Sequence, residues 1–94
     1  MRLRWLARAR RQRSDAIDWI AQDHPQAALD QLDAIEHAAD QLIDHPRLGR
    51  RGRVAGTRER VVPGTPFILI YRVRDDDVQI LRLLHHAQQR NADQ

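Results

Sequence analysis

The longest run of apolar and β-branched residues lies in the C-terminal third of the chain. Residues 67–74 (FILIYRVR) are apolar or aromatic at nearly every position, as in a strand that is buried on both faces. Asp75-Asp76-Asp77 follows, and aspartates favour turns because their side chains bond their own backbone. A second apolar run resumes over 78–84. The pattern therefore predicts a β-hairpin whose first limb is the central strand of the fold.

Two helices are predicted before this hairpin. From about Ala9 to Ala21 the apolar residues fall on one helical stripe. Between Pro25 and His45-Pro46 they recur at alternating spacings of four and three, the period of a core-facing helix. The residues at this spacing are Ala28, Leu32, Ile35, Ala39 and Leu42, and Leu29 and Ile43 make the apolar face of the helix wider. Pro25 suits a first helical turn and Pro46 ends the helix, so the two helices form an αα-hairpin.

Shorter segments complete the fold. Residues 2–6 alternate so that Leu3 and Trp5 share one face of a strand, and residues 57–62 alternate as a half-exposed strand. Residues 47–56 (RLGRRGRVAG) carry three glycines and four arginines and are expected to form a loop. Trp5 and Trp19 are expected to anchor the core. The element order is therefore β-α-α-β-β-β, an α+β fold in which the αα-hairpin packs on a small, largely antiparallel, four-stranded sheet.

Length and composition limit the class of protein. Ninety-four residues with a hydrophobic fraction of 41% suit a single domain over 1–94, with residues 90–94 expected to be a disordered polar tail. Cysteine is absent, which excludes disulfides and thiolate metal sites. No run approaches the roughly 18 apolar residues of a membrane span, so we expect no membrane association.

The charge points to acidic partners. All sixteen basic residues are arginine, the formal net charge is +3 and the sequence pI is about 10.9. Such a balance favours binding to nucleic acid or to an acidic protein.

Candidate functional residues are concentrated in the second and fourth predicted strands. Alternation places Arg58 and Arg60 on one face of their strand, and Arg82 and His86 on one face of the last strand, with His85 opposite. If the arginine-bearing faces coincide, they form a cluster of guanidiniums with one imidazole that suits phosphate or carboxylate. The sequence leaves open the alternative that these side chains cap strand edges or bond the backbone.

Several kinds of chemistry are not expected. The histidines show no HExxH spacing, and the adjacent His85 and His86 point to opposite faces of a strand, so neither a metal nor another cofactor is expected. Ser14 is the only serine and lies in a predicted helix. Without cysteine or a GxSxG elbow, covalent catalysis has no obvious nucleophile.

Five short motifs, in this order, span almost the whole chain. They are IAQDHPQAA at 20–28, HPRLG at 45–49, GTR at 56–58, YRV at 71–73 and ILRLLH at 80–85. Together with the element order they resemble the RelE/ParE toxin superfamily of bacterial type II toxin–antitoxin modules, and in particular its ParE-like branch.

The resemblance implies a cytoplasmic bacterial toxin that a cognate antitoxin neutralises, with a toxin–antitoxin hetero-oligomer as a possible assembly. ParE-type members inhibit DNA gyrase, and hence replication, without being enzymes, and this is the expected function. RelE-type members cut mRNA on the ribosome by acid–base chemistry and stabilisation of the phosphate. The first alternative is therefore a ribosome-dependent mRNA interferase. The second alternative is a non-toxic member that acts only in antitoxin binding and co-repression. Enzymatic activity stays open; if present, it is expected to be that of an endoribonuclease.

Departures from the RNase pattern favour gyrase inhibition. Val62 and Pro63 stand where RNase members carry a catalytic arginine, and the chain has no lysine. His86 falls about where some RNase members carry a catalytic histidine, so an interferase would use His86, Arg82 and Arg58. Binding of the target or the antitoxin is expected in the basic loop, its flanking strand and the C-terminal segment. The residues are Arg50, Arg51, Arg53, Arg58, Arg60, Arg82, His85 and His86. The antitoxin is expected to be acidic or amphipathic, and to wrap the αα-hairpin or add to the sheet.

Overall fold

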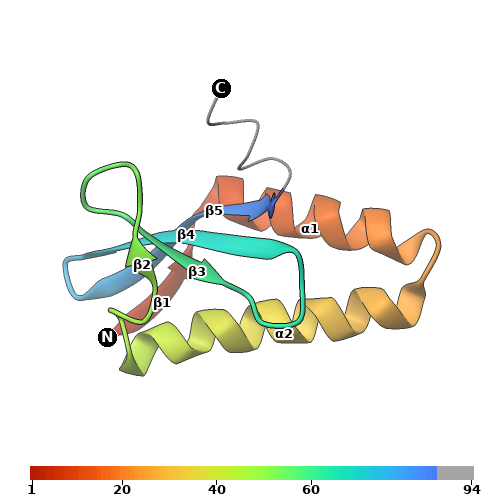
Figure 1. The fold of residues 1–94 in the computed structure, drawn as a ribbon, viewed down its shortest axis with the longest axis horizontal. Helices are drawn as coiled ribbons and strands as arrows, with labels where there is room; N and C mark the ends of the chain where they lie inside the picture. Colours follow the sequence, from red (N-terminus) through yellow and green to blue (C-terminus); the bar gives the residue numbers. More distant parts are fainter. Residues whose placement is uncertain (87–94) are drawn as a thin grey trace.

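Two helices pack on one face of a five-stranded sheet (Figure 1). The computed structural model describes residues 1–86, so the tail predicted over 90–94 lies outside the described residues. In chain order the elements are β1 (Arg2–Trp5), α1 (Ala7–Ala21), α2 (Pro25–Asp44), β2 (Arg50–Arg51), β3 (Arg58–Val61), β4 (Phe67–Arg74) and β5 (Asp77–His85). This confirms the α+β class and the αα-hairpin, and the sheet has one strand more than predicted.

The additional strand, β2, corrects the prediction of a loop throughout 47–56. Arg50 pairs with Glu59 and Arg51 with Arg58 in antiparallel register, and the N–H of Gly52 donates to the carbonyl of Thr57 at 2.8 Å. Both β2 residues are exposed arginines, and an Arg-Arg pair has no apolar alternation from which a strand could be predicted.

The strand order is β1-β5-β4-β3-β2, with β1 parallel to β5 and every other pair antiparallel. A parallel pair needs a long crossover, and here the connection includes both helices and three strands. The apolar segment Phe67–Arg74 forms β4, which lies in the middle of the sheet as predicted. Among residues 1–86, no helix is long and apolar enough to cross a membrane.

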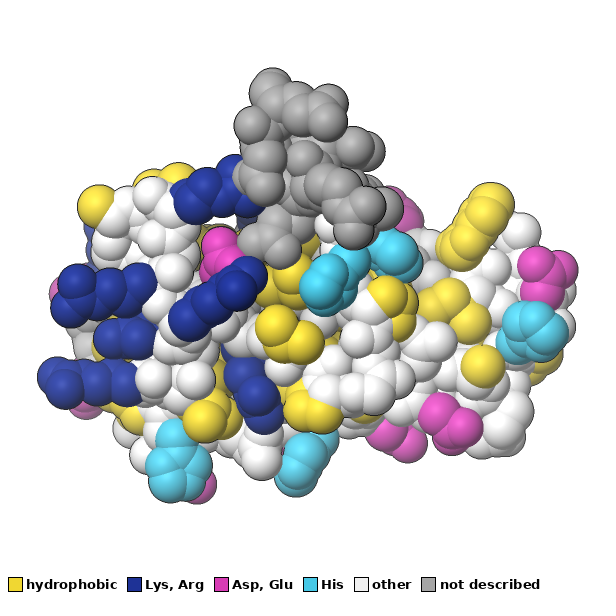
Figure 2. Space-filling view, viewed as in Figure 1, with side chains coloured by type: hydrophobic (Ala, Val, Ile, Leu, Met, Phe, Trp, Pro, Cys, Tyr) yellow, Lys and Arg dark blue, Asp and Glu magenta, His cyan; other side chains and the backbone are white. Residues whose placement is uncertain are grey.

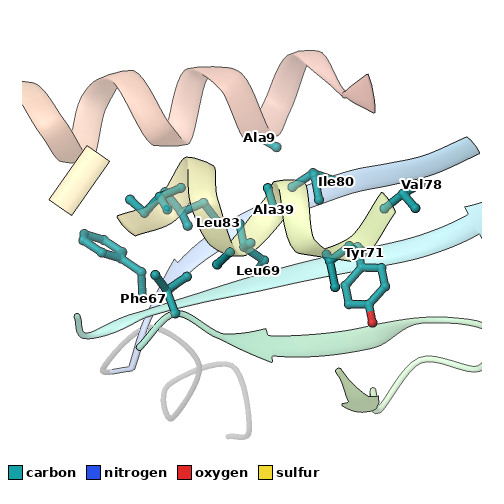
Figure 3. Packing of buried hydrophobic residues seen from close by; sticks show 12 residues of the cluster. Ala9, Ala39, Phe67, Leu69, Tyr71, Val78, Ile80 and Leu83 are labelled. Carbon is teal, nitrogen blue, oxygen red and sulfur yellow. The ribbon is translucent and has the colours of Figure 1, made fainter. Parts of the chain in front are cut away.

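The hydrophobic core lies between the helices and one face of the sheet (Figure 3). The helices contribute Ala9, Ile35, Ala38, Ala39 and Leu42, and the rest of the chain contributes Val62, Phe67, Leu69, Tyr71, Val78, Ile80 and Leu83. Leu3 and Trp5 of β1 pack against this cluster, as predicted. Burial of each large aliphatic side chain contributes about 1.5–3 kcal/mol, so the α2 stripe and β4 together hold the two layers.

Two side chains predicted to face the core are exposed instead. Trp19 on α1 is 74% exposed and Leu29 on α2 is 56% exposed. Both lie near the α1–α2 connection, and this end of the helical hairpin extends beyond the sheet in Figure 1. Trp5 meets the prediction, and the guanidinium of Arg13 lies over its ring at 4.4 Å.

The β4–β5 hairpin contains a tight turn and a bulge. Asp75 and Asp76 form the predicted turn, with φ angles of 52° and 69°. Further along, Ile70 pairs with Arg82 and Tyr71 with Ile80, which leaves Leu81 without a partner in the register. This extra residue interrupts the alternation of β5. Arg82 consequently lies on the face away from Ile80, although an even spacing would place the two together.

Candidate functional site

The sheet face turned away from the helices, here called the open face, carries a group of arginines. Its strand residues are Arg2 and Arg4 on β1, Asp77, Gln79, Arg82 and Leu84 on β5, Ile68, Ile70, Arg72 and Arg74 on β4, Glu59 and Val61 on β3, and Arg50 on β2. Figure 2 shows arginines gathered over the left part of the molecule, around β2, β3 and the β4–β5 hairpin. Hydrophobic and histidine side chains are more frequent to the right of them.

Arg82 lies in a hollow of about 220 Å³ on the open face, together with Arg53, Thr57, Glu59 and Leu84. Its Nε atom is buried without a hydrogen-bond partner. Burial, assisted by the positive charge of Arg8, lowers the pKa of Arg82 from its usual value. A guanidinium that is partly removed from water and forms no ion pair among the described residues is suited to bind an anion.

Arg58 and Arg60 lie on the opposite face from Arg82. They pair with Tyr71 and Leu69, whose side chains belong to the core, and therefore face the helices. Arg58 Nη1 donates to the carbonyl of Gly49 at 2.8 Å, and Arg60 Nη2 donates to Gln41 Oε1 on α2 at 2.8 Å. The structure therefore does not bring Arg58 and Arg82 together, and both β3 arginines hold neighbouring segments in place.

The two histidines lie at the end of the described chain. His85 pairs with Phe67, and the two rings meet edge to face at a centroid distance of 5.8 Å. His86 is exposed, and its N–H donates to the carbonyl of Pro66 at 2.9 Å. Arg58 lies opposite Tyr71, five residues from Pro66 and hence roughly 16 Å further along the strand direction. His86 and Arg58 are therefore well separated.

The basic loop, defined here as residues 50–57 with β2 at its start, is held at both ends. The Tyr71 hydroxyl accepts from the N–H of Gly49 at 2.9 Å and donates to the carbonyl of Pro46 at 2.7 Å. A Cβ at Gly49 would lie 2.7 Å from the Glu59 carbonyl oxygen and 2.7 Å from the Tyr71 ring, so only glycine fits there. Thr57 Oγ1 donates to the carbonyl of Val54 at the other end. Arg50, Arg51 and Arg53 are thus presented to solvent from a fixed base.

An apolar groove of about 300 Å³ opens between the helices and the start of β4. Its lining residues are Ala16, Trp19, Ile20, Gln31, Pro66, Phe67 and His85. Sequence reasoning does not identify Trp19 as a surface residue, because tryptophan is assigned to the core by type. Its position offers a signal, since it lies off the α1 stripe that contains Ala16 and Ile20.

A metal centre has no support in the part of the chain that the structure describes. No group of three or more His, Cys, Asp or Glu side chains is arranged there to hold an ion.

This αα-hairpin on one face of a five-stranded sheet matches the fold of the small RelE/ParE-type toxins. The structure is similar to a chain of the chromosomal ParDE toxin–antitoxin system of P. aeruginosa, with a TM-score of 0.82 and 26% identity over 90% of this chain and 95% of that one. It is also similar to a chain of the RelBE2 toxin–antitoxin complex of Mycobacterium tuberculosis, with a TM-score of 0.63 and 30% identity over 89% and 95% of the two chains. Residues 3–90 match the model of the ParE toxin of the type II toxin–antitoxin system parDE. The chain belongs to this family.

The family model is named for ParE, whereas two of the sequence relatives carry RelE names. The candidate toxin Y4kP of Sinorhizobium fredii is 40% identical over 88 residues, which cover 94% of this chain and 91% of the relative. Toxin RelE3 of Caulobacter vibrioides is 36% identical over 85 residues, which cover 88% and 91%. Family membership thus identifies a toxin of a type II module without assigning its cellular target.

Proposed function

We propose that this toxin binds and inhibits DNA gyrase rather than cutting RNA. The observation that carries the proposal is the position of Arg58 and Arg82 on opposite faces of the sheet. Cleavage of RNA requires proton-transfer groups and cations held around one phosphate. The hollow around Arg82 offers a single carboxylate, Glu59, which is paired with Arg50 at 2.9 Å.

The end of β3 supports the same conclusion. Val62 stands where the RNase branch is expected to carry a catalytic arginine, and its side chain is fully buried in the core. A residue in this position points toward the helices. It therefore has no access to a substrate on the open face.

The contact surface for gyrase is proposed to be the basic loop with the adjoining part of the open face. Arg50, Arg51 and Arg53 are exposed on the loop, and Arg82 lies in the hollow beside it. His85 is outside this surface because it lines the apolar groove beside Trp19, and His86 lies beside Pro66, away from the basic loop. Arg58 and Arg60 act indirectly, because they hold Gly49 and α2 by hydrogen bonds.

The cognate antitoxin is proposed to dock an amphipathic segment in the groove beside Trp19. Helix-in-groove recognition uses apolar side chains at regular spacing, and this groove presents an exposed tryptophan, an isoleucine and a phenylalanine. The similarity to chains of two toxin–antitoxin complexes supports a protein partner of this kind.

The gyrase proposal is tested with purified toxin, gyrase, relaxed plasmid and ATP. Inhibition of supercoiling or accumulation of cleaved DNA is expected. Arg53→Gln should weaken the inhibition, whereas Arg10→Gln, which removes the same charge from an exposed position on α1, should not. No effect on gyrase, together with mRNA cutting on purified ribosomes, would overturn the proposal.

His86→Ala separates the two toxic mechanisms. It should leave growth arrest unchanged if the toxin inhibits gyrase, and abolish it if His86 transfers protons during RNA cleavage. Expression without any growth arrest would instead favour the non-toxic role in antitoxin binding and co-repression.

A further inference from the structure

The strands contribute six arginines and two carboxylates to the open face, which leaves it with a surplus of positive charge. The arginines are Arg2, Arg4, Arg50, Arg72, Arg74 and Arg82, and the carboxylates are Asp77 and Glu59. None of the four arginines on β1 and β4 was a candidate site residue from the sequence, because their common face depends on strand register.

Both carboxylates are covered by their arginine partners. Asp77 Oδ1 lies 3.3 Å from Arg2 Nε, and Asp77 Oδ2 lies 3.8 Å from Arg4 Nη1. Glu59 Oε1 lies 2.9 Å from Arg50 Nη2. The carboxylate side chains are only 8% exposed, whereas Arg2, Arg4 and Arg50 are 83%, 58% and 66% exposed. A molecule that approaches this face therefore meets guanidiniums first.

Three further arginines of the open face form no ion pair among the described residues. Arg72 Nε donates to the neutral amide oxygen of Gln79 at 2.8 Å. Arg74 is exposed at the end of β4, and Arg82 has the unpartnered Nε described above. An anion can bind these groups without separating an existing ion pair.

The arginines are spread widely enough to contact several phosphates. They extend from β1 to β2, which is four interstrand steps or roughly 19 Å. Arg72 and Arg74 are two residues apart on one strand, so they are separated by roughly 7 Å. Duplex DNA carries one negative charge for about every 1.7 Å of its axis. A duplex lying across the sheet therefore presents many phosphates to this face.

Among the described residues, the strands of the open face carry no Trp, Tyr or Phe side chain. The chain has two Trp, one Tyr and one Phe; Trp5, Tyr71 and Phe67 lie on the helix side of the sheet and Trp19 lies on α1. Single-stranded nucleic acids are bound largely by stacking of bases on aromatic rings, and tight protein interfaces are enriched in aromatic anchors. Phosphate contacts to a duplex require neither.

We propose that the open face binds the phosphate backbone of duplex DNA without reading its sequence. This goes beyond inhibition of gyrase, because the toxin would bind DNA in the absence of gyrase. A toxin with this property would contact the DNA that gyrase holds as well as the enzyme.

The test is fluorescence anisotropy of a labelled DNA duplex titrated with purified toxin in the absence of gyrase. Micromolar to submillimolar binding at about 50 mM salt is expected, falling with salt along a log–log slope of about −3.6, or −0.9 for each of four surplus cations. Arg72→Gln/Arg74→Gln should weaken binding at least about tenfold and make the slope shallower by about 2. The Arg10→Gln/Arg11→Gln pair on α1 is the charge-matched control and should change binding much less.

Three outcomes would overturn the proposal. They are absence of duplex binding at low salt, equal weakening by both pairs of substitutions, and tighter binding of single-stranded RNA of the same length. Circular dichroism of both double variants confirms that any loss is not due to unfolding. Failure of gyrase inhibition would not affect the result, since the assay contains no gyrase.

Discussion

Asp75 and Asp76 hold the β4–β5 turn in a backbone conformation that glycine adopts more easily. Both have positive φ, and aspartate tolerates this region at a cost that glycine avoids. Asp76→Gly should raise the free energy of unfolding by about 0.5–1 kcal/mol, measured by urea denaturation. A decrease for Asp76→Gly would contradict the assignment of backbone strain.

Gly64→Ala is the converse test. Gly64 has a φ of 76°, and a Cβ there would meet no atom within 4 Å. The free energy of unfolding should therefore fall by about 1 kcal/mol from backbone strain alone.

Tyr71 connects the core to the base of the basic loop. Removal of its hydroxyl in Tyr71→Phe leaves the N–H of Gly49 and the carbonyl of Pro46 without their partner. The free energy of unfolding should fall by about 1–3 kcal/mol. A change below the error of a denaturation experiment would show that water replaces the hydroxyl.

The same residue predicts a loss of stability at alkaline pH. Burial raises the pKa of Tyr71 above 10.0, against smaller opposite effects of the Gly49 hydrogen bond and of Arg58 and Arg60. The folded protein thus holds this proton more tightly than the unfolded chain. Its contribution to stability should be complete below about pH 10 and decline as the pH rises further. Phenolate absorbance measures the titration without overlap from another tyrosine, because Tyr71 is the only one.

At the scale of elements, the exposed end of the helical hairpin predicts a separation of binding from stability. Trp19→Ala should change the free energy of unfolding by no more than about 0.5 kcal/mol, because the side chain is 74% exposed. It should weaken antitoxin binding by roughly 30-fold or more in titration calorimetry, as expected for a hot-spot residue. Leu29→Ala is the matched control, since Leu29 is 56% exposed but does not line the groove. Equal effects of the two substitutions would exclude the groove.

The elements that sequence predicted correctly are those whose pattern repeats over several turns or alternations. The second helix was predicted to run from Pro25 to the residues before His45-Pro46, and α2 spans Pro25–Asp44. The strand Phe67–Arg74 followed from its apolar run. By contrast, β2 has only two residues and neither is apolar, so its pairing with β3 depends on register, which sequence does not carry.

The candidate site was predicted by residue type but not by position. Arg58 and Arg82 were both identified, yet the side of the sheet on which each lies is decided by the β3–β4 register and by Leu81. The exposed Trp19 could not be distinguished from a core residue by hydrophobicity alone. The sequence signal is its position off the α1 stripe, and the structure shows the side chain to be 74% exposed.

At the scale of the whole molecule, the apolar groove and the arginines of the open face belong to different parts of the surface. Trp19 lies on the helical layer, whereas Arg72 and Arg74 lie on β4. Trp19→Ala should therefore remain toxic but resist neutralisation by co-expressed antitoxin. Arg72→Gln/Arg74→Gln should lose toxicity in part and still bind the antitoxin in a pull-down. Growth after induction without the antitoxin gene measures the toxicity of each variant, and growth with the antitoxin gene measures neutralisation. Loss of both properties in either variant would show that the two surfaces act as one.

The bulge at Leu81 also defines where this toxin can be shortened. Every β4–β5 pair on either side of Leu81 is in regular alternation, so deletion of this one residue would leave Arg82 opposite Ile70 and Ile80 opposite Tyr71. Deletion of Leu83 would instead bring Leu81 into register and turn Arg82 toward the core. For redesign or for comparison of homologous chains, position 81 is therefore the point in β5 where loss of one residue preserves the β4–β5 pairing. Deletion of one residue elsewhere in the second half of β5 moves the residues between that position and the bulge to the opposite face of the sheet.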